Sequence, residues 1–201
     1  SKNNIISYSG CITQLFFFCF FVISECFILS AMAYDRYVAI CKPLLYTVTM
    51  SPQVCLFLLL GVYGMGVWGA LVHTGNILFL NFCAENLVNH FMCDILPLLE
   101  LSCNGSYMNT LVVCILVAFG IGVPIVTIFL SYVFILSSIF HIRSTEGRSK
   151  AFSTCSSHIM AVSFFFGSGV FTYLRPPSIL PLDQGKVSSL FYTIVVPMLN
   201  P

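Results

Sequence analysis

The stretch CITQLFFFCFFVISECFILSAMAYDRY, residues 11–37, decides the fold class of this chain. Residues 11–34 are uncharged apart from Glu25, and a helix needs about 20 mostly apolar residues to cross a bilayer. Asp35 and Arg36 then follow side by side before apolar residues return. A charge pair is costly inside a bilayer but inexpensive at its edge. The stretch therefore predicts a membrane-spanning helix that ends at this pair.

The composition of the whole chain also favours a membrane protein. Of its 201 residues, 58% are hydrophobic and 7% are charged, whereas soluble domains carry about 25% charged residues. So few charged side chains could not cover the surface of a soluble globule of this size. The net charge of +1 and the lack of a dense basic stretch argue against a nucleic acid partner.

Long apolar runs continue along the rest of the chain. They are too long for barrel strands and show no alternation of period two, so we expect helices. The predicted spans of a single domain, 1–201, are residues 11–34, 54–80, 107–140, 151–174 and 187–201. The prediction is an all-α membrane protein with four full spans and part of a fifth.

The basic residues predict how these helices are oriented. Connections 35–53 and 141–150 carry five lysines and arginines, and the segments 1–10, 81–106 and 175–186 together carry three. The positive-inside rule therefore assigns the first set to the cytoplasm. The first predicted helix then runs from outside to inside, and residues 81–106 form an outer loop.

The ten cysteines divide in the same way. Four fall on the predicted outer side, where disulfides persist, and they permit three pairings: Cys11, Cys83, Cys93 and Cys103. Six lie in spans or at the inner face, where we expect free thiols: Cys19, Cys26, Cys41, Cys55, Cys114 and Cys155.

Five short motifs occur in an order that resembles one family. MAYDRYVAIC followed by KPLLY (32–46) resembles the inner end of the third helix of rhodopsin-like G-protein-coupled receptors, and of olfactory receptors in particular. The further olfactory-receptor matches are HFMCD (90–94) in the second outer loop, Ser131 and Tyr132 in the fifth helix, KAFSTCSSH (150–158) in the sixth and PMLNP (197–201) in the seventh. The resemblance implies a seven-transmembrane-helix receptor bundle. This chain would be a partial sequence that holds helices three to six and the start of helix seven.

The resemblance implies an odorant-sensing receptor in the plasma membrane of olfactory neuron cilia. It would bind a small volatile organic ligand and activate a stimulatory, olfactory-type heterotrimeric G protein, without a cofactor and without enzymatic activity. Three alternatives stay open: a rhodopsin-like receptor for a lipid or metabolite, a channel or transporter fragment, and a non-functional gene copy. KAFSTCSSH argues against the first, and a single intramembrane acid without internal repeats argues against the second.

By the same resemblance, the inner helix ends carry the switch that meets the G protein. Its residues would be Asp35, Arg36, Tyr37, Tyr132 and Lys150. Arg36 would pair with Asp35 at rest and exchange this partner for Tyr132 and the G protein on activation. Arg148 and His158 would line the same cavity, although basic residues there also serve as membrane anchors.

The ligand cavity is expected in the outer half, between helices three, five and six. Its predicted residues are Phe18, Cys19, Val22, Ile23, Leu116, Gly120, Ile121, Gly169, Val170 and Tyr173. The set is mostly apolar, as small-molecule pockets are, and it holds no acid that could pair with a ligand ammonium. For each of these residues, ordinary helix packing is the alternative.

The outer side and the membrane interior hold further candidate sites. The resemblance pairs Cys11 with Cys93 and Cys83 with Cys103. Glu25 is an intramembrane acid about three turns above Arg36; it is either part of a sodium site or protonated and hydrogen-bonded.

Two motifs of the predicted outer loop concern modification and metal binding. NGS (104–106) is a glycosylation sequon at Asn104. His90, Cys93 and Asp94 have the ligand chemistry of copper or zinc, but a disulfide at Cys93 would exclude it. No metal site is therefore predicted.

Overall fold

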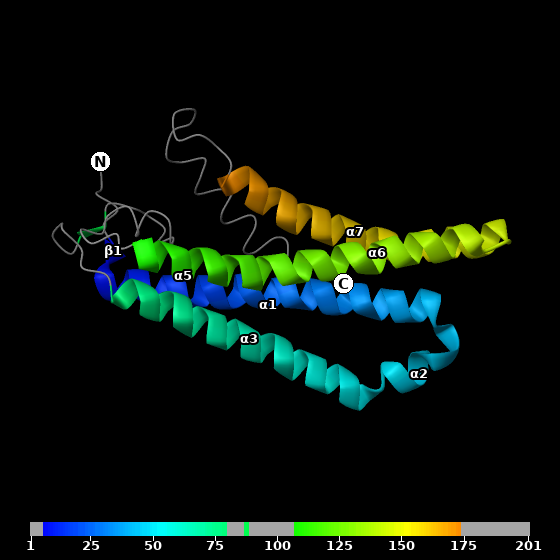
Figure 1. Ribbon diagram of the computed structural model, residues 1–201, viewed down its shortest axis with the longest axis horizontal. Helices are drawn as coiled ribbons and strands as arrows, with labels where there is room; N and C mark the ends of the chain where they lie inside the picture. Colours follow the sequence, from blue (N-terminus) through cyan, green and yellow to red (C-terminus); the bar gives the residue numbers. More distant parts are fainter. Residues whose placement is uncertain (1–5, 80–86, 89–106, 174–201) are drawn as a thin grey trace. The chain divides into compact units, whose positions relative to one another are not determined.

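The structure is a computed structural model that describes residues 6–79, 87–88 and 107–173. Its helices are α1 (Tyr8–Cys41), α2 (Tyr46–Thr49), α3 (Pro52–Leu78), α5 (Tyr107–Val117), α6 (Val123–His141) and α7 (Thr145–Tyr173) (Figure 1). A 3₁₀ turn, η1 (Pro43–Leu45), precedes α2, and a π-helical segment, η2 (Ala118–Gly122), joins α5 to α6. The strands β1 (Ile6–Ser7) and β2 (Leu87–Val88) pair antiparallel, with Ile6 opposite Val88.

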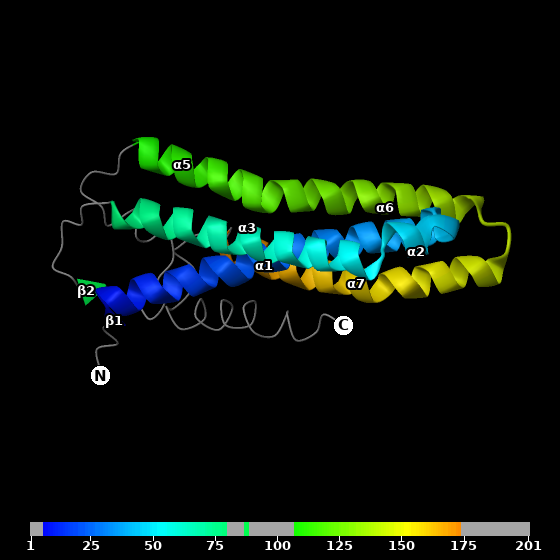
Figure 2. The same ribbon diagram turned by 90° about the horizontal axis from the view of Figure 1, so that it is seen from below.

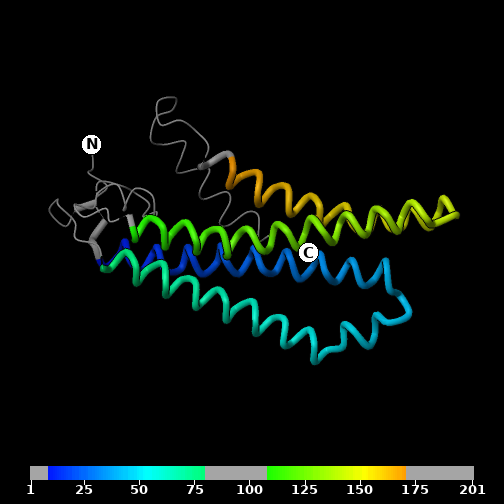
Figure 3. The backbone as a smooth tube through the Cα atoms, viewed as in Figure 1, coloured from blue at the N-terminus to red at the C-terminus, as the bar shows by residue number. Residues whose placement is uncertain are grey.

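Local sequence explains where the long helices begin and end. Figure 3 shows α1 as one continuous helix up to the turn before α2, and it ends at Cys41 because Lys42 precedes Pro43. Helix α3 begins at Pro52, a favoured first helical residue, after Ser51, whose hydroxyl accepts a hydrogen bond from Val54 N at 3.4 Å.

The segment η2 ends at Gly122, two residues before Pro124. Proline has no N–H group for the helical ladder, and a widened π-helical turn accommodates this loss. The apolar stretch from α5 to α6 therefore stays helical through the proline.

Three described helical segments are long and apolar enough to cross a membrane: Ser9–Cys41, Pro52–Leu78 and Met108–His141. Helix α7 covers residues 151–173 of the fourth predicted span, but it begins in the polar segment 145–150 and is not among the three. Residues 187–201, and the loop 81–106 except for β2, lie outside the described residues. The limits of a single receptor domain therefore stay a prediction.

The position of Asp35 and Arg36 differs from the expected one. The sequence predicts that the helix ends at this pair, whereas α1 continues to Cys41. No helix breaker occurs before Pro43, so both charged residues lie within the last turns of the helix.

The described residues belong to two compact units. Of the described residues, one unit consists of 6–24, 63–79, 87–88 and 107–122, and the other of 25–62 and 123–173. In the first unit, α1 and α3 approach closely where Gly66 faces Ser24 and where Gly69 faces Ile23.

In the second unit, α6 and α7 lie side by side and antiparallel, joined by a short turn (Figures 1 and 2). Buried residues recur at helical spacing on α6, at Pro124, Ile128, Ser131, Ile135 and Ile139, and on α7, at Ala151, Cys155, His158, Ala161 and Phe165. Ile135, Ile139, Ala151 and Cys155 form one core cluster, against which Tyr37 of α1 packs. These helices also carry exposed apolar side chains, including Phe129, Phe134 and Phe164, as a surface in contact with lipid would.

Candidate functional site

A buried histidine joins three helices of the second unit. His158 of α7 is fully buried. Its Nδ1 lies 2.6 Å from the Tyr132 hydroxyl of α6, and its Nε2 lies 3.0 Å from the carbonyl oxygen of Leu29 in α1. The His158 and Tyr132 rings also stack, with centroids 5.7 Å apart. One side chain therefore connects α1, α6 and α7.

The two partners of His158 determine where its proton lies. A backbone carbonyl can only accept a hydrogen bond, so Nε2 carries the proton and donates a hydrogen bond to the carbonyl oxygen of Leu29. In the neutral ring, Nδ1 is then an acceptor, and the Tyr132 hydroxyl donates to it. The single hydroxyl proton of Tyr132 is thus committed to His158.

Arg36 lies close to this network, but the expected ion pair with Asp35 is not formed. Arg36 is a charged neighbour of Tyr132, Cys155 and His158. Its Nε is buried and has no hydrogen-bond partner, and no ion pair joins Arg36 to any of the described residues. The reason is geometric, because consecutive residues of a helix do not face each other.

Asp35 instead binds the connection that follows α1. Its Oδ1 accepts a hydrogen bond from the Tyr46 hydroxyl at 2.9 Å. This hydrogen bond and the carboxylate charge raise the pKa of Tyr46 above its ordinary value, because ionisation would remove the donor and set two negative charges side by side. Sequence reasoning did not single out Tyr46 as a partner, although it ends the KPLLY motif.

Tyr37 and Cys41 close the last turns of α1 onto α6. The Tyr37 ring lies 5.9 Å from that of Phe134, and Lys42 Nζ lies 5.8 Å from the centre of the Tyr37 ring. Cys41 Sγ lies 3.1 Å from Ser138 Oγ. The predicted switch residue Tyr37 is therefore a packing contact between these two helices.

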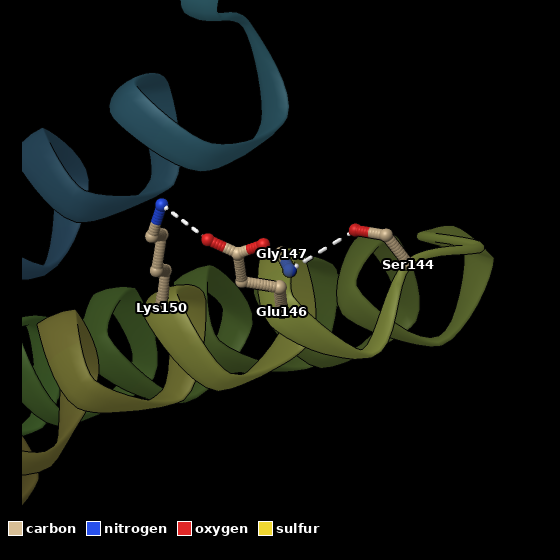
Figure 4. Close-up of polar contacts among 4 residues, drawn as sticks. All are labelled: Ser144, Glu146, Gly147 and Lys150. Carbon is tan, nitrogen blue, oxygen red and sulfur yellow. Dashed lines mark hydrogen bonds and ion pairs between the residues drawn. The ribbon is translucent and has the colours of Figure 1, made fainter.

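Lys150 and Arg148 lie in the first two turns of α7, next to the connection between α6 and α7. Lys150 Nζ lies 2.9 Å from Glu146 Oε1, and these side chains are 78% and 80% exposed (Figure 4). Arg148 donates to the carbonyl oxygens of Ile142 and Phe140, at 2.7 and 3.3 Å. Among the described residues, no hydrogen bond or ion pair joins either side chain to Tyr132, His158 or Arg36. The structure therefore places Arg36 near Tyr132 and His158, whereas the described polar contacts of Lys150 and Arg148 are all close to the connection between α6 and α7.

The same connection gives a direct comparison of a helix cap with a surface ion pair. The Ser144 hydroxyl caps α7 by accepting a hydrogen bond from Gly147 N at 3.0 Å (Figure 4). We expect Ser144→Ala to destabilise the full-length protein by about 1 kcal/mol. Glu146→Gln should change stability by less than about 1 kcal/mol, because its ion pair is exposed. Thermal unfolding in detergent tests this order, and a larger loss for Glu146→Gln than for Ser144→Ala would contradict it.

The residues predicted to bind a ligand fall in both units. In the first, Cys19 and Ile23 are buried, and a Cβ at Gly120 would lie 3.9 Å from Ile23 Cγ1. Four further side chains of the set are partly buried in the same unit: Phe18, Val22, Leu116 and Ile121. In the second unit, Gly169 has open space around it and Val170 is exposed, while the side chain of Tyr173 lies outside the description. The structure thus brings Ile23 next to Gly120, and the ligand role of the whole set stays a prediction.

The cysteines follow the predicted division as far as the structure describes them. Cys11 is disulfide-bonded, and none of the six described cysteines expected to be thiols forms a disulfide. Cys83, Cys93 and Cys103 lie outside the described residues. The pairings Cys11–Cys93 and Cys83–Cys103 therefore stay predictions.

The other candidate sites are only partly described. Glu25 is buried in α1, and its sodium and hydrogen-bonding alternatives both stay open. Asn104, His90 and Asp94 lie outside the described residues. Within the described ranges, no group of three His, Cys, Asp or Glu residues could hold a metal ion.

Comparison with known proteins assigns the chain to a family. The olfactory receptor family model matches residues 2–201. The chain is 78% identical over 201 residues to Olfactory receptor 8B12 of Homo sapiens and 76% identical over 201 residues to Olfactory receptor 8B8 of Mus musculus. Each match covers all of this chain, which spans 65% of the length of each relative. These matches confirm the predicted resemblance and the class of an α-helical, multi-pass membrane receptor rather than an enzyme. The chain belongs to the olfactory receptor family.

Proposed function

We propose that this chain is the larger part of an odorant-sensing G-protein-coupled receptor. The receptor binds a small volatile organic ligand between the outer halves of its helices and activates a stimulatory, olfactory-type heterotrimeric G protein at their inner ends. Its place is the plasma membrane of olfactory neuron cilia. The observation that carries the proposal is the family match over residues 2–201.

In this proposal, α1 is the third helix of the bundle, α3 the fourth, α5 to α6 the fifth, and α7 the sixth. Glu25 is buried within the third helix. The ligand contacts come from the predicted set, of which Ile23 and Gly120 are neighbours. The outer disulfides Cys11–Cys93 and Cys83–Cys103 shape the entrance to the ligand cavity. Asn104 is the candidate glycosylation site.

The contacts of His158 support a resting arrangement of the switch. They hold α7 against α1 and α6 through two hydrogen bonds. Tyr132 must leave His158 before its hydroxyl can reach another partner. A ligand that favours separated inner helix ends would shift the population by the difference between its affinities for the two states.

Arg36 is the residue that meets the G protein in this scheme. Its Nε has no hydrogen-bond partner among the residues that the structure describes, and no Asp35 ion pair needs to be broken. A guanidinium offers several donors in a fixed geometry, which suits the carbonyl and carboxylate groups at the end of a partner helix. Once Tyr132 is released from His158, it can join Arg36 in this contact.

A cyclic-AMP assay in cells that carry the full-length gene tests the proposed function. We expect at least one member of a panel of volatile odorants to raise cyclic AMP, and Arg36→Ala to abolish this response while surface expression is retained. Arg143→Ala is the matched control, because it removes an equally charged but exposed arginine and should leave the response near that of the wild type.

The outcomes test the odorant receptor function and the switch role of Arg36 separately. A response that survives Arg36→Ala would keep the odorant receptor and exclude the role given to Arg36. Silence of a well-expressed wild-type receptor across the panel would argue for a receptor of another ligand class or for a non-functional gene copy.

A further inference from the structure

Two polar side chains lie on the buried face of α3 in the first unit. From Tyr63 onward, the buried residues of this helix are Gly66, Gly69, Ala70, His73, Thr74 and Ile77. They recur at intervals of three or four positions and so share one face. The residues Val67, Trp68, Leu71 and Leu78 are 42–58% exposed on the other side. His73 and Thr74, which are 4% and 7% exposed, therefore point into the packing of the unit.

Contacts on either side of His73 locate it between α1 and α5. One turn nearer the carboxyl end of α3, the Asn76 side-chain amide donates a hydrogen bond to the carbonyl oxygen of Asn109 in α5 at 3.5 Å. In the other direction, Gly69 faces Ile23 of α1, which belongs to the predicted ligand set. His73 is about one turn from each of these contacts. The polar pair is thus adjacent to the level at which the ligand is expected.

One polar atom of each side chain lacks a hydrogen-bond partner within the described part of the chain. His73 Nδ1 and Thr74 Oγ1 are shielded from solvent and make no hydrogen bond with the described residues. Buried polar groups are nearly always hydrogen-bonded in native proteins, and inside a bilayer no surrounding water offers a substitute. Two such groups on consecutive residues point to a polar group of a bound molecule.

We propose that His73 and Thr74 form a hydrogen-bonding subsite for an uncharged ligand with a hydroxyl or carbonyl oxygen. This inference rests on the proposed function, in which the same region binds a small organic molecule. An imidazole can donate or accept at Nδ1 according to its tautomer, and a threonine hydroxyl can do both. The pair therefore suits alcohols, aldehydes and ketones, whereas a hydrocarbon would leave both atoms unpaired.

The charge of the surroundings restricts the ligand further. Among the described residues of the first unit, which are 6–24, 63–79, 87–88 and 107–122, no Asp, Glu, Lys or Arg occurs. A ligand ammonium or carboxylate would lose its hydration there without gaining a fixed counter-ion from these residues. The subsite is therefore specific for a neutral oxygen function.

The test compares matched odorants on the full-length receptor. Each alcohol, aldehyde or ketone of the panel is paired with the hydrocarbon of the same skeleton, and surface expression is measured for every variant. We expect the oxygenated member to activate the wild type at a concentration at least about tenfold lower. His73→Leu should raise the half-maximal concentration of the oxygenated member by about tenfold, the effect of one lost hydrogen bond, and leave that of the hydrocarbon unchanged.

Three more variants keep the test decisive if His73→Leu does not reach the surface. An asparagine amide lies near the position of Nδ1, and a glutamine amide lies near that of Nε2. His73→Asn should therefore retain more of the preference for the oxygenated odorant over its hydrocarbon than His73→Gln. Thr74→Val removes the hydroxyl at constant shape and should weaken the preference for the oxygenated odorant severalfold.

Several outcomes would overturn the subsite. These are equal shifts for both members of each pair, no shift in any of the variants, and activation by charged odorants alone. Silence of the well-expressed wild type would instead overturn the proposed function on which the subsite rests.

Discussion

Replacing Gly66 by leucine should remove nearly all of the full-length receptor from the cell surface, whereas the same change at Gly64 should leave surface expression close to that of the wild type. The two glycines lie two positions apart on α3 and differ in what surrounds them. A Cβ at Gly66 would overlap Ser24 Oγ, and it would lie 3.2 Å from both Phe20 Cδ2 and the Phe20 carbonyl oxygen of α1. At Gly64, nothing lies within 4 Å.

The physical reason is overpacking against a neighbour that cannot move away. The Phe20 carbonyl oxygen belongs to the backbone of α1, so the two helices would have to separate to accept a side chain at Gly66. Overpacking of a core costs about 1–3 kcal/mol and sometimes more, and leucine adds three carbons beyond Cβ. Both substitutions gain similar helix propensity, about 1 kcal/mol, so that term cancels in the comparison.

Flow cytometry of an amino-terminal epitope tag measures the outcome directly. Gly66→Ala should fall between the wild type and Gly66→Leu, because it adds only the Cβ. Equal surface expression of Gly66→Leu and Gly64→Leu would show that the close approach of α1 and α3 is not needed for folding.

His158→Leu should raise ligand-independent cyclic AMP by about tenfold. The substitution removes both hydrogen bonds that join α7 to α1 and α6, and it leaves the Tyr132 hydroxyl and the second acceptor position of the Leu29 carbonyl without this partner. An unsatisfied buried polar group costs about 1–3 kcal/mol. A loss of only about 1.4 kcal/mol from the resting state changes the population ratio tenfold.

His141→Leu is the matched control for this experiment. His141 is an exposed histidine near the end of α6, and its Nδ1 lies 2.7 Å from the carbonyl oxygen of Ser137 in the same helix. The control therefore makes the same chemical change without breaking a contact between helices. Basal activity that is unchanged in His158→Leu, or that rises equally in both variants at matched surface expression, would show that the contacts of His158 do not stabilise the resting state.

The amino-acid sequence by itself determined the helices and the family. Apolar runs long enough to span a bilayer, proline and serine at helix ends, and the distribution of charge are properties of continuous segments, so they can be read without knowing which segments meet. The same holds for the family motifs, because their residues follow one another along the chain. That six cysteines form no disulfide could be expected for the related reason that each lies in or beside an apolar span.

Only the tertiary structure decided which polar groups are partners. Asp35 and Arg36 are neighbours in sequence, yet helix geometry separates their side chains and gives Asp35 to Tyr46. His158 was expected beside Arg36, but nothing in the sequence pointed to the carbonyl oxygen of Leu29, which lies 129 positions away and belongs to the backbone. The distinction between Gly64 and Gly66 is also tertiary, because both are glycines in an apolar helix and α1 approaches closely only at Gly66. Such choices depend on which faces of distant segments meet, and no local pattern of residues encodes that.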